Sequence, residues 1–220
     1  INLITAMRLN TEQIEALDNR YRALFINALS GFKGANLIAT CDHGKNTNLA
    51  IFTSVFHIGS MPPLLGMISR PHSVTRDTLE NIVQTGHYTI NHVNASIIEQ
   101  SHQSSARYEK ETSEFQATGL REQWFDDFPV PFVQESRIQL GMKLREQHQL
   151  EINNTVMIIG EIIYINIKDD VVQQDGYVDI ERAGSIATSS LDSYHRTEVL
   201  TRLSYAKPGK PPEQLTHRKK

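Results

Sequence analysis

The chain has 220 residues, with 22 Lys and Arg against 25 Asp and Glu and a formal net charge of −3. This balance argues against the strongly basic surface of a nucleic-acid-binding protein. The single cysteine excludes an intrachain disulfide, and no apolar stretch reaches the roughly 18 residues of a membrane span. We therefore expect a single domain over residues 1–220 that is cytoplasmic, with neither a nucleic acid nor a membrane as partner.

The first half of the chain predicts one helix and then several closely spaced strands. Apolar residues recur at helical spacing over 11–29, where Thr11 can act as the cap and Ser30-Gly31 as the stop. Strands are predicted at 35–41, 48–58 and 64–69. The turns between them are short, which favours antiparallel pairing over β-α-β crossovers.

The second half adds a helix from Asp77 that ends at Gly86, where a left-handed glycine stops many helices. Further strands are predicted at 87–93, 134–145 and 156–167, with a polar connection at 146–155. Residues 95–119 are expected to be mostly helical or irregular, and 205–220 extended. Six or seven strands against three helices predict a mainly β fold, a closed or partly closed antiparallel barrel.

The segment from Ser69 to Thr78 is the first candidate site, because it leaves a strand and enters a helix. A helix start presents free backbone N–H groups and a partial positive charge, which suit an anion. The surrounding side chains that could help to hold a phosphate are Ser69, Arg70, Ser73, Thr75, Arg76 and Thr78. The open alternative is that Ser73 or Thr75 caps the helix while the arginines face solvent.

The second candidate site is the polar strand over residues 46–54. Its polar side chains at alternate positions could hydrogen-bond a ribityl chain or the edge of a flat heteroaromatic ring. The alternative is a half-exposed strand whose polar side chains face water.

Other chemistries find little support. The nine histidines form no HExxH helix or Cys/His cluster, so we expect no bound metal. No Gly-x-Ser-x-Gly elbow surrounds a nucleophile. The absence of a Gly-x-Gly-x-x-Gly motif argues against a Rossmann domain, so a nicotinamide nucleotide would have to be a visiting substrate.

Several short motifs in order resemble one family. They are Asn48-Leu49-Ala50-Ile51-Phe52-Thr53-Ser54, Pro62-Pro63, Arg76-Asp77-Thr78, Asn81-Ile82, Ile90-Asn91, Ser113-Glu114-Phe115, Gly119-Leu120 and Leu191-Asp192-Ser193-Tyr194. The order and spacing resemble the flavin reductase-like, FMN-binding split-barrel proteins, in the flavoredoxin branch. The resemblance covers a core of about residues 21–196, with the helix at 11–29 and the tail at 205–220 outside its centre.

The resemblance implies an antiparallel Greek-key split β-barrel, a homodimer and one FMN per subunit near the dimer interface. Asn48, Thr53 and Ser54 would line the ribityl chain and ring edge, and Asn91 would support the site. Tyr194, with Arg196, would lie near the ring or the nicotinamide approach. Together with the anion argument, the predicted cofactor-binding residues are Asn48, Thr53, Ser54, Ser69, Arg70, Ser73, Arg76, Thr78, Asn91 and Tyr194.

The implied activity is that of an NAD(P)H:flavin oxidoreductase that passes a hydride to flavin and electrons onward. A monooxygenase or a redox protein would fit as the acceptor. The alternative is a non-enzymatic FMN electron-transfer protein that a protein partner reduces. The chain has Ile186-Ala187-Thr188-Ser189-Ser190 where relatives often carry an Arg-Leu-Gly-Gly type of sequence, so the donor site is less well defined than the FMN site.

Overall fold

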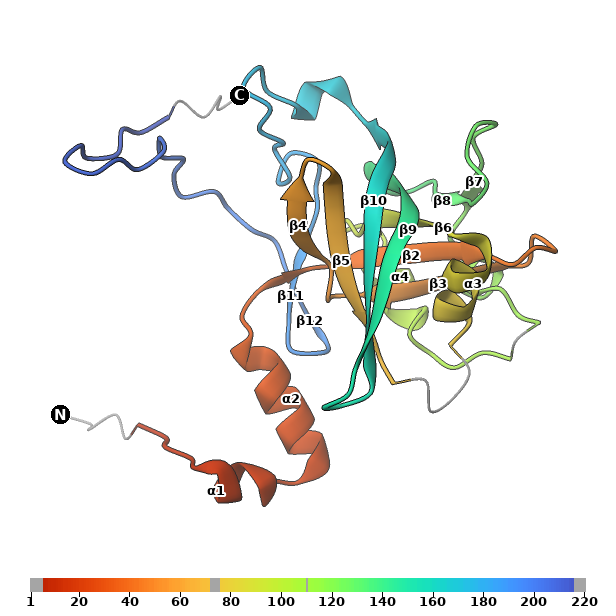
Figure 1. Cartoon of the computed structure of the whole chain (residues 1–220), viewed down its shortest axis with the longest axis horizontal. Coiled ribbons are helices and arrows are strands. Elements are labelled where there is room, and N and C mark those ends of the chain that lie inside the picture. Colours follow the sequence, from red (N-terminus) through yellow and green to blue (C-terminus); the bar gives the residue numbers. More distant parts are fainter. Residues whose placement is uncertain (1–5, 72–75, 110, 216–220) are drawn as a thin grey trace.

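The structure is a computed structural model that describes residues 6–71, 76–109 and 111–215. One seven-stranded antiparallel sheet forms its centre, with the strand order β3-β2-β6-β9-β10-β5-β4 (Figure 1). The strands are β2 Asn36–Cys41, β3 Thr47–Phe52, β4 Phe56–Ser60, β5 Pro63–Ser69, β6 His87–His92, β9 Ile138–Leu150 and β10 Thr155–Ile167. The predicted mainly β, antiparallel fold is confirmed.

Smaller elements decorate this sheet. Five short strands form two further sheets: β1 Lys33–Gly34, β11 Ala187–Ser189 and β12 Ser193–His195 in one, β7 Glu122–Gln123 and β8 Phe132–Val133 in the other. The helices are α1 Thr11–Glu15, α2 Asn19–Leu29, α3 Asp77–Thr85, α4 Ile98–Gln103, α5 Glu114–Thr118 and the 3-10 turn η1 Asp169–Val171. None of the helices in the described ranges is long and apolar enough to cross a membrane.

The link between β3 and β4 closes the sheet into a barrel. These two strands are consecutive in the chain but lie at opposite edges of the sheet. The Ser54 hydroxyl donates to the Ile68 carbonyl (2.9 Å) and accepts from the Ile68 N–H (3.2 Å), which ties the link to β5. The predicted single strand over 48–58 is therefore two strands. Apolar residues on both sides of Ser54 hide the break from the sequence pattern.

Two apolar clusters lie on the two faces of the sheet. The barrel interior holds Ile38, Met67, Ile82, Tyr88, Ile90, Met142 and Ile158. Gly160 faces the Tyr88 ring so closely that a Cβ there would collide with the phenol. The outer face of β2 and β3 packs against α4, α5 and β11 through Leu37, Leu49, Phe115 and Ile186. The barrel is thus covered on one side, which holds β3 in place.

The structure also differs from the predicted element bounds. The helix predicted over 11–29 is divided into α1 and α2, because Asp18 accepts from two N–H groups and caps the second helix. Asn10, rather than Thr11, caps the first helix. Strand β9 continues to Leu150, through the first half of the predicted polar connection. Its end is exposed on both faces, so polar residues there do not exclude a strand.

The described N-terminal arm with α1 and α2, and the described segment after β12, both extend away from the barrel (Figure 1). Neither α1 nor α2 has a buried residue, and Phe32 just after α2 is 69% exposed. The C-terminal segment up to residue 215 carries only isolated bridges, such as Leu203 with Gln214. These arms lie outside the apolar clusters of the barrel.

Candidate functional site

Four buried polar side chains meet where α3 covers β2 and β3. Asn48 donates from Nδ2 to the Thr78 hydroxyl (2.9 Å) and to the Thr40 hydroxyl (3.3 Å). Asn81 donates to the same Thr40 hydroxyl (3.1 Å). We call Thr40, Asn48, Thr78 and Asn81 the α3 polar cluster. It joins Asn48 and Thr78, two predicted site residues that are 30 positions apart.

The sequence explains how this cluster forms. Thr40 and Asn48 are register partners on neighbouring antiparallel strands, so their side chains share one face. The apolar stripe of α3, with Leu79 and Ile82, packs into the barrel interior beside them. Thr78 lies in the first turn of that helix, which places its hydroxyl over β3.

Two polar atoms of the α3 polar cluster have hydrogen-bonding capacity that the described residues do not use. Within the described residues, the Thr78 hydroxyl accepts one hydrogen bond, but its own hydrogen has no acceptor. The Asn48 carbonyl oxygen likewise accepts nothing from the part of the chain that is described. Because buried polar groups are normally paired, these atoms are suited to a polar ligand.

The segment predicted to hold a phosphate begins at the end of β5. Ser69 is buried there, and Arg70 is exposed beside it. Arg76 stands at the cap position of α3, where its side chain makes no capping hydrogen bond. Its Nε donates instead to the Pro71 carbonyl (3.4 Å), so the end of β5 and the start of α3 are close together. Ser73, with Thr75, lies outside the described residues.

The two segments predicted from sequence therefore adjoin at two points. Asn48 contacts Thr78, and Ser54 contacts Ile68, the residue before Ser69. Thr53 and Ser54 are partly buried in the link that closes the barrel. The Ser54 hydroxyl already bonds to the backbone of β5. A ligand at this link would therefore contact its backbone groups more readily than the Ser54 hydroxyl.

The remaining two predicted residues lie elsewhere. Asn91 is fully buried in β6, with all its polar atoms bonded to the protein itself. Tyr194 in β12 packs against the outer-face cluster, and its hydroxyl bonds to His102 Nδ1 (2.9 Å). No hydrogen bond in the described residues joins either of them to the α3 polar cluster.

Comparison with known proteins decides the family. The family described as "Flavin reductase like domain" matches residues 29–183. This chain belongs to that family. The predicted resemblance is thereby confirmed, since the matched region covers most of the chain and includes every strand of the barrel.

Solved structures of this flavin reductase-like fold agree. A candidate flavin reductase with a split-barrel domain from Shewanella frigidimarina is 53% identical, with a TM-score of 0.88, over 91% of this chain and all of that one. Nitrilotriacetate monooxygenase component B from Bacillus cereus is 15% identical, with a TM-score of 0.79, over 90% and 99%. Flavoredoxin of Desulfovibrio vulgaris is 19% identical, with a TM-score of 0.64, over 81% and 92%. The last two show the split-barrel fold alone.

The Ser113-Glu114-Phe115 motif, which resembles that of the family, stabilises strand β3. The Glu114 carboxylate accepts from the Leu49 N–H (2.9 Å), and Ser113 bonds to Thr47 (2.8 Å). Phe115 fills the outer-face cluster. Burial raises the pKa of Glu114. The Ser-Glu-Phe motif therefore holds the free edge of β3, and with it the strand that carries Asn48.

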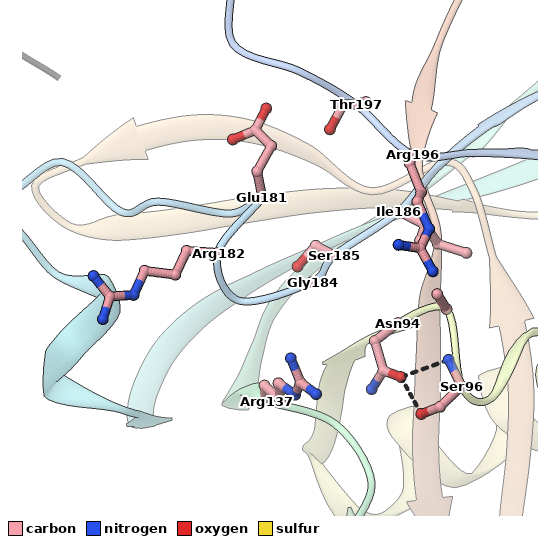
Figure 2. A pocket seen from close by; sticks show the side chains of 11 residues that line it. Asn94, Ser96, Arg137, Glu181, Arg182, Gly184, Ser185, Ile186, Arg196 and Thr197 are labelled. Carbon is pink, nitrogen blue, oxygen red and sulfur yellow. Dashed lines mark hydrogen bonds between the residues drawn. The ribbon is translucent and has the colours of Figure 1, made fainter. Parts of the chain in front are cut away.

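A cavity of about 570 Å³ lies where β6 ends and β9 begins, and the sequence did not predict it. Figure 2 shows its walls, which are built from four separate parts of the chain. Its lining residues are Asn94, Ala95, Ser96, Arg137, Glu181, Arg182, Gly184, Ser185, Ile186, Arg196 and Thr197. Of these residues, only Arg196 was predicted from the sequence to lie near the flavin site. Arg137 stands in no recognisable motif, so spacing alone gives no signal for it.

Proposed function

We propose that this protein binds FMN at the junction of the α3 polar cluster and the β3–β4 link, and that it is an NAD(P)H-dependent flavin oxidoreductase. Membership in the flavin reductase-like family supports flavin-related oxidoreductase chemistry. The observation that carries the proposal is the hydrogen bond between Asn48 and Thr78, which brings together the two segments predicted to bind flavin.

The residues present fit a phosphorylated flavin. Arg70 and Arg76 flank the end of β5 and the start of α3, where charged hydrogen bonds to a phosphate are favourable. The Thr78 hydroxyl retains an unused hydrogen for a phosphate oxygen. Ser69 and Ser73 would complete the phosphate contacts. Asn48 and Thr53 would lie along the ribityl chain and ring edge, and Tyr194 near the ring.

The protein would contribute orientation and electrostatics, while the bound flavin would supply the two-electron chemistry. Backbone N–H groups at Thr53 and Ser54 would stabilise negative charge on the reduced ring. The contact between Ser54 and Ile68 fixes these groups in place before any ligand arrives. Preorganised donors of this kind need no rearrangement during the reaction.

The proposal includes a homodimer, which the exposed apolar side chains near α2 support. Tyr21 is 47% exposed, Leu29 is 67% exposed and Phe32 is 69% exposed. Large apolar side chains that are exposed along one segment are candidates for an interaction site. We also propose that a monooxygenase or a redox protein accepts the electrons.

The test is a visible spectrum of the purified protein, followed by steady-state oxidation of NADH and NADPH by the FMN-loaded form. We expect a flavin spectrum and turnover with at least one donor. A flavin spectrum without turnover, on added FMN or ferric complexes, would leave a non-enzymatic flavin carrier as the function. A colourless protein that takes up no FMN at micromolar concentration would refute the flavin site itself.

A further inference from the structure

Two arginines in the 570 Å³ cavity point toward the same space (Figure 2). Arg137 is the residue directly before β9, and Arg196 is the residue directly after β12. Arg182 also lines the cavity, but it turns toward Asp170 and pairs with that carboxylate (3.1 Å). Arg137 and Arg196 are therefore the two guanidinium groups that face the cavity.

Among the residues that the structure describes, neither of these two arginines has an acidic partner. Arg137 makes one long hydrogen bond, to the Ala183 carbonyl (3.5 Å). Within the described ranges, Arg196 has no hydrogen bond or ion pair. Both arginines are exposed to solvent, so their donors are open to an anion that enters the cavity. Their planar donors match the oxygens of a phosphate.

A third group in the cavity needs a donor rather than an acceptor. Glu181 lines another wall, and its Oε2 is buried with no hydrogen-bond partner in the described structure. A carboxylate oxygen can only accept, so it suits a ligand hydroxyl or amide. A ligand that carries both a phosphate and free hydroxyls satisfies the arginines and Glu181 together. The ribose–phosphate part of a nucleotide has this chemistry.

The cavity lies at the same end of the sheet as the β3–β4 link. Asn36 at the start of β2 pairs with Phe52 on one side and with His92 on the other. Asn94, which lines the cavity, lies two residues after His92, and Thr53, in the link, lies one residue after Phe52. Two strand spacings, about 10 Å, therefore separate the cavity wall from the link. A dinucleotide can span this separation.

We propose that the cavity holds the adenosine ribose and diphosphate of NADH, with the nicotinamide directed to the β3–β4 link. This inference rests on the proposed function, because it assigns the donor site of the same reaction. Arg137 and Arg196 hold the diphosphate. Glu181 accepts a hydrogen bond from the ribose 2′-hydroxyl, as acidic residues do in other dinucleotide sites. The 2′-phosphate of NADPH would be repelled there, so NADH is the preferred donor.

The first test compares NADH with dihydronicotinamide riboside, which carries the same reactive ring but neither diphosphate nor adenosine. In Arg137→Ala and Arg196→Ala we expect the KM for NADH to rise at least tenfold, with kcat within twofold. The KM for the riboside stays within twofold of the wild-type value. Arg145→Ala is the matched control, since Arg145 pairs with Glu161 in the middle of β9, roughly 25 Å along the strand from Arg137. It should change neither KM.

The second test concerns the choice between NADH and NADPH. In Glu181→Gln, the ratio of kcat/KM for NADH to that for NADPH should fall at least tenfold, because the repulsion of the 2′-phosphate is removed. An unchanged ratio would overturn the role of Glu181.

Isothermal titration with NADH separates a failure of this inference from a failure of the proposed function. If wild type binds NADH without oxidising it, and Arg137→Ala weakens that binding tenfold, the cavity assignment holds and the reductase activity fails. If wild type does not bind NADH at millimolar concentration, the cavity assignment is overturned. It is also overturned if Arg137→Ala weakens both donors equally, or if it lowers FMN affinity while riboflavin affinity is unchanged.

Discussion

Two buried asparagines show how differently the same residue type is used in this barrel. Asn91 donates to the Leu37 carbonyl (3.1 Å) and the Thr89 hydroxyl (2.9 Å), and accepts from the Val133 N–H (3.0 Å). Asn48 donates only to the hydroxyls of the α3 polar cluster, and its carbonyl oxygen is unused by the described residues. Burial and residue type are alike. What separates structural support from a candidate site is whether hydrogen-bonding capacity is left over.

The largest expected effect is on folding stability in Asn91→Ala. The change leaves the Val133 N–H and the Leu37 carbonyl without their side-chain partner. We expect a loss of about 3 kcal/mol in the free energy of unfolding, the scale of unpaired buried polar groups. Urea unfolding followed by circular dichroism measures it. Asn48→Ala, which removes bonds to hydroxyls only, should cost about 1 kcal/mol. Equal losses in the two variants would abolish the distinction drawn between them.

The next effect is the pH dependence of stability at His92, the neighbour of Asn91. Burial lowers the pKa of His92 from 6.5 to about 4, and its Nδ1 bonds to Ser185 (2.9 Å). In the unfolded chain His92 takes up a proton below pH 6.5, whereas in the folded chain it stays neutral. Its stabilisation is therefore complete above pH 6.5 and is lost as the pH falls toward 4.

This loss should reach about 2 kcal/mol between pH 6.5 and 4.5. Unfolding free energies measured at both pH values for wild type and His92→Asn give the contribution of this residue. The variant should lose less stability on acidification than wild type does. Parallel pH profiles for the two proteins would show that His92 is not held neutral.

A smaller effect is expected from Thr78→Val in the α3 polar cluster. The change keeps the shape and removes the hydroxyl, so FMN affinity should fall by about 1 kcal/mol. Riboflavin, which lacks the phosphate, should bind as before. Thr85→Val is the control, because its hydroxyl bonds within the other end of α3, to the Asn81 carbonyl (2.8 Å). If Thr85→Val lowered FMN affinity more than Thr78→Val did, the loss could not be assigned to the Thr78 hydroxyl at the site.

The positions of many barrel strands could be predicted, because their side chains either alternate between buried and exposed positions or are buried on both faces. Strands β2, β5 and β10 begin and end within two residues of the predicted bounds. The break at Ser54 could not be predicted, because it depends on a hydrogen bond to β5 across the closed barrel. The length of β9 was missed because its last residues are exposed on both faces.

The candidate site divides in the same way. The hydrogen bond between Asn48 and Thr78 joins two motifs that could be named from the sequence, although they lie 30 positions apart in the chain. The cavity with Arg137 and Arg196 depends on β6, β9 and β12 reaching one end of the sheet, which no local pattern records. Asn91 was predicted to support the site from the neighbouring strand, and this role stays a prediction. Its sequence context could not show that its polar atoms are all used within the protein.

The central claim is that the flavin phosphate lies at the end of β5 and the start of α3, beside Arg76. Titration of the apoprotein with FMN and with riboflavin, in wild type and in Arg76→Ala, tests it most directly. We expect FMN binding to weaken by about 2 kcal/mol in the variant, the scale of a charged hydrogen bond, while riboflavin affinity is unchanged. Equal losses for both ligands, or no loss for either, would contradict the placement of the phosphate at Arg76.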